Sequence, residues 1–183
     1  MSLVAASAGP HADLISSHIR DVPDFPEPGI LFKDITGLLV DPEGFRAVID
    51  ALAHAVPADV DLVAGMEARG FILGAALAAH LGKGFVPIRK AGKLPPPTHA
   101  VTYDLEYGQA CLELREGTVR PGVGVLLVDD VLATGGTAAA AAQLVEAVGA
   151  RVVGLAFLLE LTALDGRSRL AGREVSSILA TAP

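Results

Sequence analysis

Two adjacent carboxylates and the glycine-rich loop behind them are the residues of this chain best placed to do chemistry. The carboxylates are Asp129 and Asp130, and the loop that follows, residues 133–137, reads Ala-Thr-Gly-Gly-Thr. Glycines allow backbone N–H groups to converge on an anion, and a helix beginning directly after the loop adds its positive end. This order of residues predicts a phosphate-binding loop beside a pair of acids.

The acid pair, Asp129 and Asp130, does not suit the phosphate itself because like charges repel. Carboxylates instead accept strong hydrogen bonds from hydroxyl groups, so a ribose with its 5′-phosphate in the loop would satisfy both features. An isolated acidic pair would more often only end a strand and cap a turn, but the adjoining loop favours the ribose interpretation. The residues assigned to the 5′-phosphate, called the phosphate loop below, are Ala133, Thr134, Gly135, Gly136 and Thr137.

Two common glycine motifs do not fit this stretch. A P-loop requires a lysine directly before its Ser or Thr, and Gly136 takes that place here. A dinucleotide-binding fingerprint places its glycines after the strand, whereas Gly122 and Gly124 precede it and Leu127 fills the third glycine position. The pattern therefore indicates neither a P-loop nucleotidase nor a dinucleotide-binding enzyme.

The surrounding sequence predicts the elements that must hold these groups. The apolar run 125–128 is typical of a strand buried on both faces, with the acid pair at its end and Thr137 capping the next helix. A second buried strand at 61–65, a following helix and a strand at 85–88 make a βαβ unit. Such a unit implies a parallel sheet with a right-handed crossover.

The rest of the chain predicts further α/β elements and one long loop. Expected helices are a short one at 11–20 and one opened by Asp41 and Pro42. Expected extended segments are 30–35, an arm at 103–114 with a turn at Gly108, and strands at 152–159 and 177–179. The basic, proline-rich stretch from Arg89 to about Thr102 shows no periodicity, which is typical of a long functional loop.

Composition limits the classes of function. A length of 183 residues with 51% hydrophobic content suits one globular domain. The net charge of −7 argues against a nucleic-acid partner, which needs a basic face. No signal peptide or membrane-spanning stretch is recognisable, and the single Cys111 suits a reducing compartment. We therefore expect a cytoplasmic protein with neither nucleic acid nor membrane as partner.

Residues 125–137, reading Val-Leu-Leu-Val-Asp-Asp-Val-Leu-Ala-Thr-Gly-Gly-Thr, resemble the phosphoribosyl-diphosphate motif of the type I phosphoribosyltransferases. Other segments are similar, in the same order, to motifs of the adenine-specific members of that family. These segments are 23–35, 67–71, 88–95, 105–108 and 160–162. The resemblance covers nearly the whole chain, and several independent motifs are more specific than the acid pair and loop alone.

The resemblance implies a fold and an assembly. The chain would be a single α/β domain over residues 1–183, with the type I fold: a central, mostly parallel sheet flanked by helices. A small N-terminal hood at about 1–36 would bind the base, and a mobile lid loop and arm would occupy about 90–108. The family also implies a homodimer, with part of the basic stretch acting across its interface.

The resemblance also implies a reaction, in which adenine N9 is joined to ribose C1 of phosphoribosyl diphosphate to give AMP and diphosphate. Mg²⁺ would be bound mainly through the substrate phosphates. Asp129 and Asp130 would hold the ribose hydroxyls, Glu106 would be the general acid/base, and Tyr107 would help to close the lid. The diphosphate-binding residues would be Arg69, Arg89 and Lys93, and the base-binding residues Leu31, Phe32, Lys33 and Leu161. A non-proline cis peptide is expected near Glu67 and Ala68.

Two alternative functions would use the same phosphate loop and acid pair. A phosphoribosyltransferase for a 6-oxopurine would differ in the base site, because an amino donor at C6 and an oxo acceptor need opposite partners. A non-catalytic regulator that senses phosphoribosyl diphosphate would need a DNA-binding module and a basic face, and the acidic charge argues against it. The match of the hood and of the arm at 105–108 favours adenine.

Overall fold

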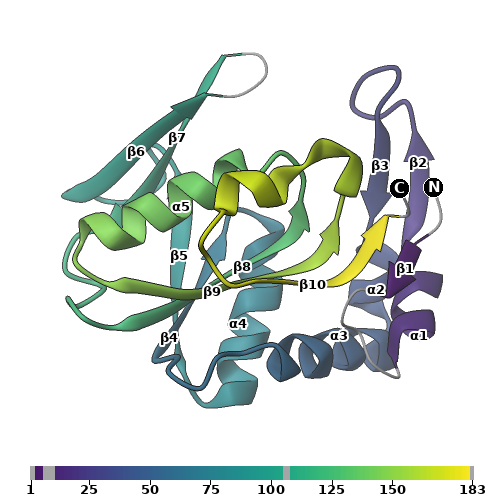
Figure 1. Cartoon of the computed structure of the whole chain (residues 1–183), viewed down its shortest axis with the longest axis horizontal. Helices are drawn as coiled ribbons and strands as arrows, with labels where there is room; N and C mark the ends of the chain where they lie inside the picture. The colour runs from purple at the N-terminus through teal and green to yellow at the C-terminus, as the bar shows by residue number, and fades with distance from the viewer. Residues whose placement is uncertain (1–2, 6–10, 105–107, 182–183) are drawn as a thin grey trace.

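The computed structural model describes residues 3–5, 11–104 and 108–181. Its centre is an eight-stranded sheet in the order β1-β10-β9-β8-β4-β5-β7-β6 (Figure 1). The strands are β1 Leu3–Ala5, β4 Leu62–Met66, β5 Gly84–Lys90, β6 Thr98–Asp104, β7 Gln109–Arg115, β8 Gly124–Leu132, β9 Arg151–Glu160 and β10 Val175–Thr181. The five strands from β10 to β5 are parallel, and the edge strands are antiparallel, which confirms the expected mostly parallel α/β sheet.

Helices cover both faces of this sheet. On one face lie α1 Ala12–Ser17, α2 Thr36–Val40, α3 Pro42–His54 and α4 Arg69–Leu81, and on the other lies α5 Gly136–Ala147 (Figure 1). Alternate residues of β8 serve the two layers: Leu126 and Val128 pack with α3 and α4, whereas Val125 and Leu127 pack with α5. Burial on both faces is the reason for the unbroken apolar run in this strand.

Two antiparallel hairpins project from the same side of the molecule, one of them formed by the edge strands β6 and β7 (Figure 1). One is a separate antiparallel pair, β2 Arg20–Pro23 and β3 Leu31–Asp34. The other is β6 and β7, with Gly108 at φ +93° where a turn was expected. The hairpins frame the space above the carboxyl ends of β4 and β8.

Three details differ from the sequence-based expectations. β8 does not end before the acid pair, because its pairing with β9 continues through Asp129 to Leu132. Thr137 does not cap α5 but lies inside the helix. The N-cap residue is Gly135, which adopts a left-handed backbone conformation with a φ of +78°. The basic stretch is not a loop as far as Thr102, because β6 begins at Thr98 and pairs with β7 directly after the prolines. The long loop is therefore about half its expected length.

The predicted helix after Asp41 is confirmed, and the Asp41 carboxylate accepts a hydrogen bond from the N–H of Gly44 at 2.6 Å. The left-handed Gly82, at φ +64°, ends α4 as expected. β2 was not predicted, because all four of its residues are exposed and no alternation marks it. Within the described parts of the chain, no helix is both long and apolar enough to cross a membrane.

Candidate active site

A cavity of about 440 Å³ lies at the carboxyl ends of β4 and β8, between the two hairpins. Sites in open parallel sheets form at this edge, where the loops after neighbouring strands diverge. The cavity brings together most of the predicted site residues, from five separate stretches: Leu31, Phe32, Lys33, Arg69, Asp129, Asp130, Ala133, Thr137 and Leu161. Glu67, Lys90 and Tyr103, to which no role was assigned, also line it.

The phosphate loop lines an adjoining hollow of about 80 Å³ together with Asp129 and Phe157. The first turn of α5 opens onto this hollow, so the unpaired N–H groups and the positive end of the helix face it. A Cβ on Gly135 would lie 2.3 Å from the carbonyl oxygen of Gly166. Glycine is therefore required here both by the positive φ and by the close approach of another backbone.

A Gly135→Ala variant should weaken phosphate binding. The added Cβ must displace Gly166, and the positive φ costs a non-glycine residue about 1–3 kcal/mol, so we expect the loop to shift. The dissociation constant of AMP, measured by calorimetry, should rise about tenfold or more, since about 1.4 kcal/mol corresponds to a factor of ten. As a matched control, Gly172→Ala has a similar φ of +82° but open space around it. An equal loss of AMP affinity in both variants would contradict the close-approach explanation.

The acid pair lies at the floor of the cavity, with Asp130 buried and Asp129 half-buried. Asp130 is only 4% exposed, and its N–H donates to Oδ1 of Asp129 at 2.9 Å. Its own Oδ2 lies 2.9 Å from Nε of Arg69 but has no hydrogen bond of good geometry within the described residues. Burial, followed by the charge of Asp130, raises the pKa of Asp129. A buried acceptor without a donor is unfavourable, so this site is suited to an incoming hydroxyl group.

Arg69 connects the acid pair to the N-terminal hairpin. Besides its ion pair with Asp130, its guanidinium lies 5.0 Å from the centre of the Phe32 ring, a cation–π arrangement. The Phe25 ring packs edge to face against the Phe32 ring, with 5.2 Å between their centres. The side chain that was expected to bind diphosphate therefore contacts both Asp130 and an aromatic ring of the β2–β3 hairpin.

The other two predicted cations are held by a carboxylate at the end of β4. Glu67 accepts hydrogen bonds from Nζ of Lys93 at 2.9 Å, from the N–H of Lys90 at 2.9 Å and from Nε of Arg89 at 3.4 Å. Arg89 in turn donates to the carbonyl oxygen of Lys93 at 3.0 Å. Arg69 and Lys90 line the cavity, whereas Arg89 and Lys93 gather around Glu67 at its edge. The expected cis peptide joins Glu67 and Ala68.

The charge of Glu67 should show in the pH dependence of stability. Burial raises the pKa of Glu67, but the hydrogen bonds from Lys93, Lys90 and Arg89 outweigh it and lower the value to about 2. A depressed folded-state pKa stabilises the fold above the ordinary value, and the benefit is lost as the pH falls toward 2. Glu67→Gln should therefore lower the thermal midpoint at pH 7, with the deficit shrinking between pH 4.5 and the acid limit of folding. Thermal unfolding of both proteins at stepped pH measures this, and a pH-independent deficit would contradict it.

The predicted base-binding residues line the opposite wall. Lys33 is 5% exposed and its Nζ donates to Asp21 at 2.5 Å, so its backbone rather than its ammonium serves the cavity. Leu161 follows β9, and its N–H donates to the carbonyl oxygen of Leu132 at 2.9 Å. This bond places an apolar side chain directly beside the start of the phosphate loop.

Two predicted residues, Glu106 and Tyr107, lie outside the described residues. What the structure does show of this arm is Tyr103, whose hydroxyl lies 3.1 Å from Oγ1 of Thr137. This contact joins the β6–β7 hairpin to the phosphate loop. Tyr103 was not predicted as a site residue, although it opens the predicted arm in a chain with only two tyrosines.

Comparison with known proteins agrees with this geometry. Residues 38–179 match the model of the phosphoribosyl transferase domain. An adenine phosphoribosyltransferase of Acidothermus cellulolyticus is 57% identical over 91% of this chain and 95% of its own length. The crystal structure of adenine phosphoribosyltransferase from Thermoanaerobacter pseudethanolicus superposes with a TM-score of 0.90 at 49% identity, covering 93% of this chain and 99% of that one. The Saccharomyces cerevisiae enzyme, complexed with an imino-altritol bisphosphate and adenine, has a TM-score of 0.87 at 40% identity, covering 92% and 98%. The chain therefore belongs to the phosphoribosyltransferase family, and within it to the adenine phosphoribosyltransferases.

Proposed function

We propose that this protein transfers the 5-phosphoribosyl group from phosphoribosyl diphosphate to adenine, giving AMP and diphosphate in purine salvage. The observation that carries the proposal is that one cavity joins the phosphate loop, the acid pair and the apolar wall of the hood. A nucleoside monophosphate has the same three parts in the same order. The relatives named above support adenine as the base.

The sugar phosphate is bound at the floor of the site. The phosphate loop and the N-terminus of α5 receive the 5′-phosphate, and Asp129 and Asp130 accept hydrogen bonds from the 2′- and 3′-hydroxyls. As diphosphate leaves C1, positive charge develops on the ring, as in other glycosyl transfers. The negative charge of the acid pair, of which Asp130 is buried, lies close to that ring and stabilises it.

The leaving group is received by the cations beside β4. Arg69 lines the cavity, and Arg89 and Lys93 reach its edge through Glu67. Mg²⁺, carried by the phosphate oxygens, would supply further positive charge to the departing diphosphate. The donor set fits this arrangement: the acid pair offers carboxylate oxygens beside the sugar, while the described residues hold no cluster of three His, Cys, Asp or Glu side chains.

The base enters between the hood and Leu161. Phe32 and Leu161 supply apolar surfaces for the faces of the purine, and the backbone of Leu31 and Lys33 is available to its edge. Glu106, on the arm of the β6–β7 hairpin, is the proposed acid/base for a ring nitrogen, and Tyr107 the proposed lid residue. Both roles rest on the similarity of residues 105–108 to the family motif.

The wider proposal includes a homodimer in the cytoplasm. The half-buried, unpaired Cys111 suits a reducing compartment. Part of the basic loop after β5 would act across the dimer interface, as the family resemblance implies. Sedimentation at micromolar concentration tests the assembly, and a purely monomeric, active enzyme would exclude this part of the proposal.

Ligand-induced stabilisation tests the proposed site as a whole. A ligand that binds only the folded protein stabilises it by about 2.7 kcal/mol at one hundred times its dissociation constant. We expect AMP and phosphoribosyl diphosphate each to raise the thermal midpoint, and IMP to raise it less than AMP at equal concentration. A larger shift with IMP would favour a 6-oxopurine as the substrate.

A further inference from the structure

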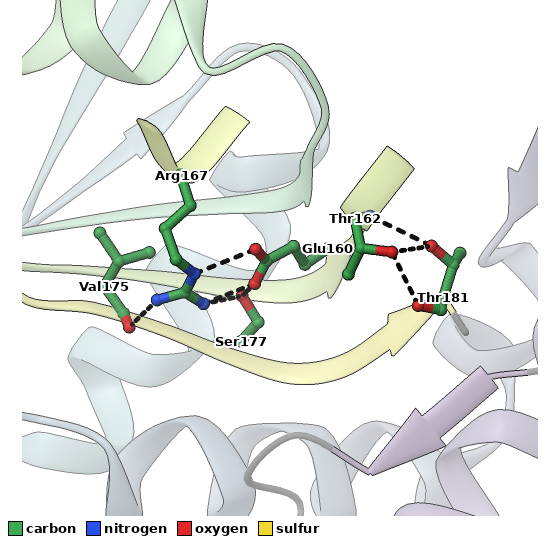
Figure 2. A network of polar contacts seen from close by, with 6 residues as sticks. All are labelled: Glu160, Thr162, Arg167, Val175, Ser177 and Thr181. Carbon is green, nitrogen blue, oxygen red and sulfur yellow. Dashed lines mark hydrogen bonds and ion pairs between the residues drawn. The ribbon is translucent and has the colours of Figure 1, made fainter. Parts of the chain in front are cut away.

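A polar network joins the end of β9, the following turn and β10, outside the residues assigned to substrate (Figure 2). Glu160 and Ser177 are buried in it, whereas the side chain of Arg167 is 47% exposed. Arg167, in the short helix η3 Gly166–Leu170, donates from Nε to Oε1 of Glu160 at 3.0 Å and from Nη2 to Oε2 at 2.5 Å. Its Nη1 donates to the carbonyl oxygen of Val175 at 2.7 Å, and Ser177 donates to Glu160 at 2.9 Å. The two-point contact fixes the orientation of the guanidinium as well as its distance.

One end of this network meets the base-binding wall. Glu160 is the last residue of β9, is 8% exposed, and directly precedes Leu161. The next residue, Thr162, is held as well: its hydroxyl donates to the carbonyl oxygen of Thr181 at 2.9 Å (Figure 2). The position of Leu161 is therefore set from both sides, by β8 through its own N–H and by β10 through its neighbours.

The other end meets the phosphate loop. Gly166, directly before Arg167, approaches that loop so closely that a Cβ on it would lie 2.1 Å from the carbonyl oxygen of Ala133. The same Cβ would lie 2.9 Å from the backbone nitrogen of Gly135. The backbone that carries Arg167 thus packs directly against the backbone that forms the phosphate loop.

We propose that Arg167 is a positioning residue that, through Glu160 and Gly166, fixes the phosphate loop relative to the base-contacting Leu161. Residues 161–166 connect the two subsites. The hydrogen bonds from Arg167 to Glu160 join the residue directly after this segment to the residue directly before it. The distance between the subsites must match the length of AMP from base to phosphate. This inference rests on the proposed function, since it assigns the two ends of the segment to the two ends of one ligand.

Binding of AMP and of its two parts distinguishes this role from a general loss of structure. In Arg167→Ala the dissociation constant of AMP should rise about ten- to a hundredfold, because the two linked parts of AMP lose part of the gain from binding both subsites at once. Adenine alone and ribose 5-phosphate alone each use one subsite, so their dissociation constants should change less than about threefold, the usual scatter from context. Arg167→Lys keeps the charge without the fork and should fall between the two.

The chain offers a control outside this segment. Arg173 makes an equivalent two-point contact with Glu146 of α5, at 2.5 and 3.0 Å, at the end of the helix far from the phosphate loop. Arg173→Ala should lower the thermal midpoint but leave the binding of AMP and of its parts unchanged. If Arg167→Ala does not fold, Arg167→Lys carries the test.

Three results would overturn the inference: unchanged AMP affinity in the Arg167 variants, equal losses for AMP and for its separate parts, or the same AMP loss in Arg173→Ala. Failure of the unmodified protein to bind AMP would instead contradict the proposed function. The two failures are therefore distinguishable within one set of titrations.

Discussion

Glu106→Gln is expected to lower the turnover number for AMP formation by about 10²–10⁴-fold, the usual contribution of a general acid or base. The amide retains the size of the carboxyl group but cannot exchange a proton with a purine nitrogen. The KM values of adenine and phosphoribosyl diphosphate should change little, because the interaction that is lost belongs to the transition state. Initial-rate kinetics with each substrate varied measure both quantities.

Glu116→Gln is the matched control for this prediction. It makes the same chemical change at an exposed position directly after the end of β7. Its kinetic constants should equal those of the unmodified enzyme. Full turnover in Glu106→Gln would remove Glu106 from the mechanism and leave the arm as a lid only.

Asp130→Asn should damage binding and turnover together. Asp130 is buried, and its loss of charge leaves Arg69 without its ion-pair partner and the ribose without a charged acceptor. We expect kcat/KM for phosphoribosyl diphosphate to fall about 10²–10³-fold, as for the removal of one preorganised electrostatic group. Initial-rate kinetics provide the measurement, with unfolding curves to show that the variant is folded.

Asp129→Asn provides the comparison within the pair. Burial and the neighbouring Asp130 raise the pKa of Asp129, so the environment stabilises the charge of this carboxylate less than that of an exposed aspartate. The loss in kcat/KM should therefore be smaller than for Asp130→Asn. A larger loss at Asp129 would show that Asp129, rather than Asp130, carries the more important charge.

The elements that could be predicted from the sequence are those whose structure follows from the local order of apolar and capping residues. The strands β4 and β9 and the first part of β8 are apolar runs because they are buried on both faces, and the capping position of Asp41 predicted α3. The extent of β8 was wrong because polar residues at 129–130 mask a strand whose pairing with β9 continues. Strand pairing is a tertiary property, and local sequence does not carry it.

The site likewise combines groups that are adjacent in the sequence with contacts that only the fold brings together. The phosphate loop and acid pair could be proposed from the sequence because their residues are contiguous, and the hood residues because a family motif marks them. Glu67 was not recognised as the group that gathers Lys93, 26 residues further along the chain. The contacts of Arg167 with Glu160 and of Gly166 with Ala133 were likewise absent from the expectations, since the fold alone brings them together.

A comparison of purine bases decides whether the cavity forms AMP from adenine. Purified enzyme with saturating phosphoribosyl diphosphate and Mg²⁺ is given adenine, hypoxanthine or guanine, and kcat/KM is measured for each. We expect adenine to exceed both oxopurines by at least about 100-fold, because a site built for an amino donor leaves a polar group unpaired with an oxo acceptor. Faster turnover of hypoxanthine or guanine, or tight binding of phosphoribosyl diphosphate with no nucleotide formed from any base, would contradict the account.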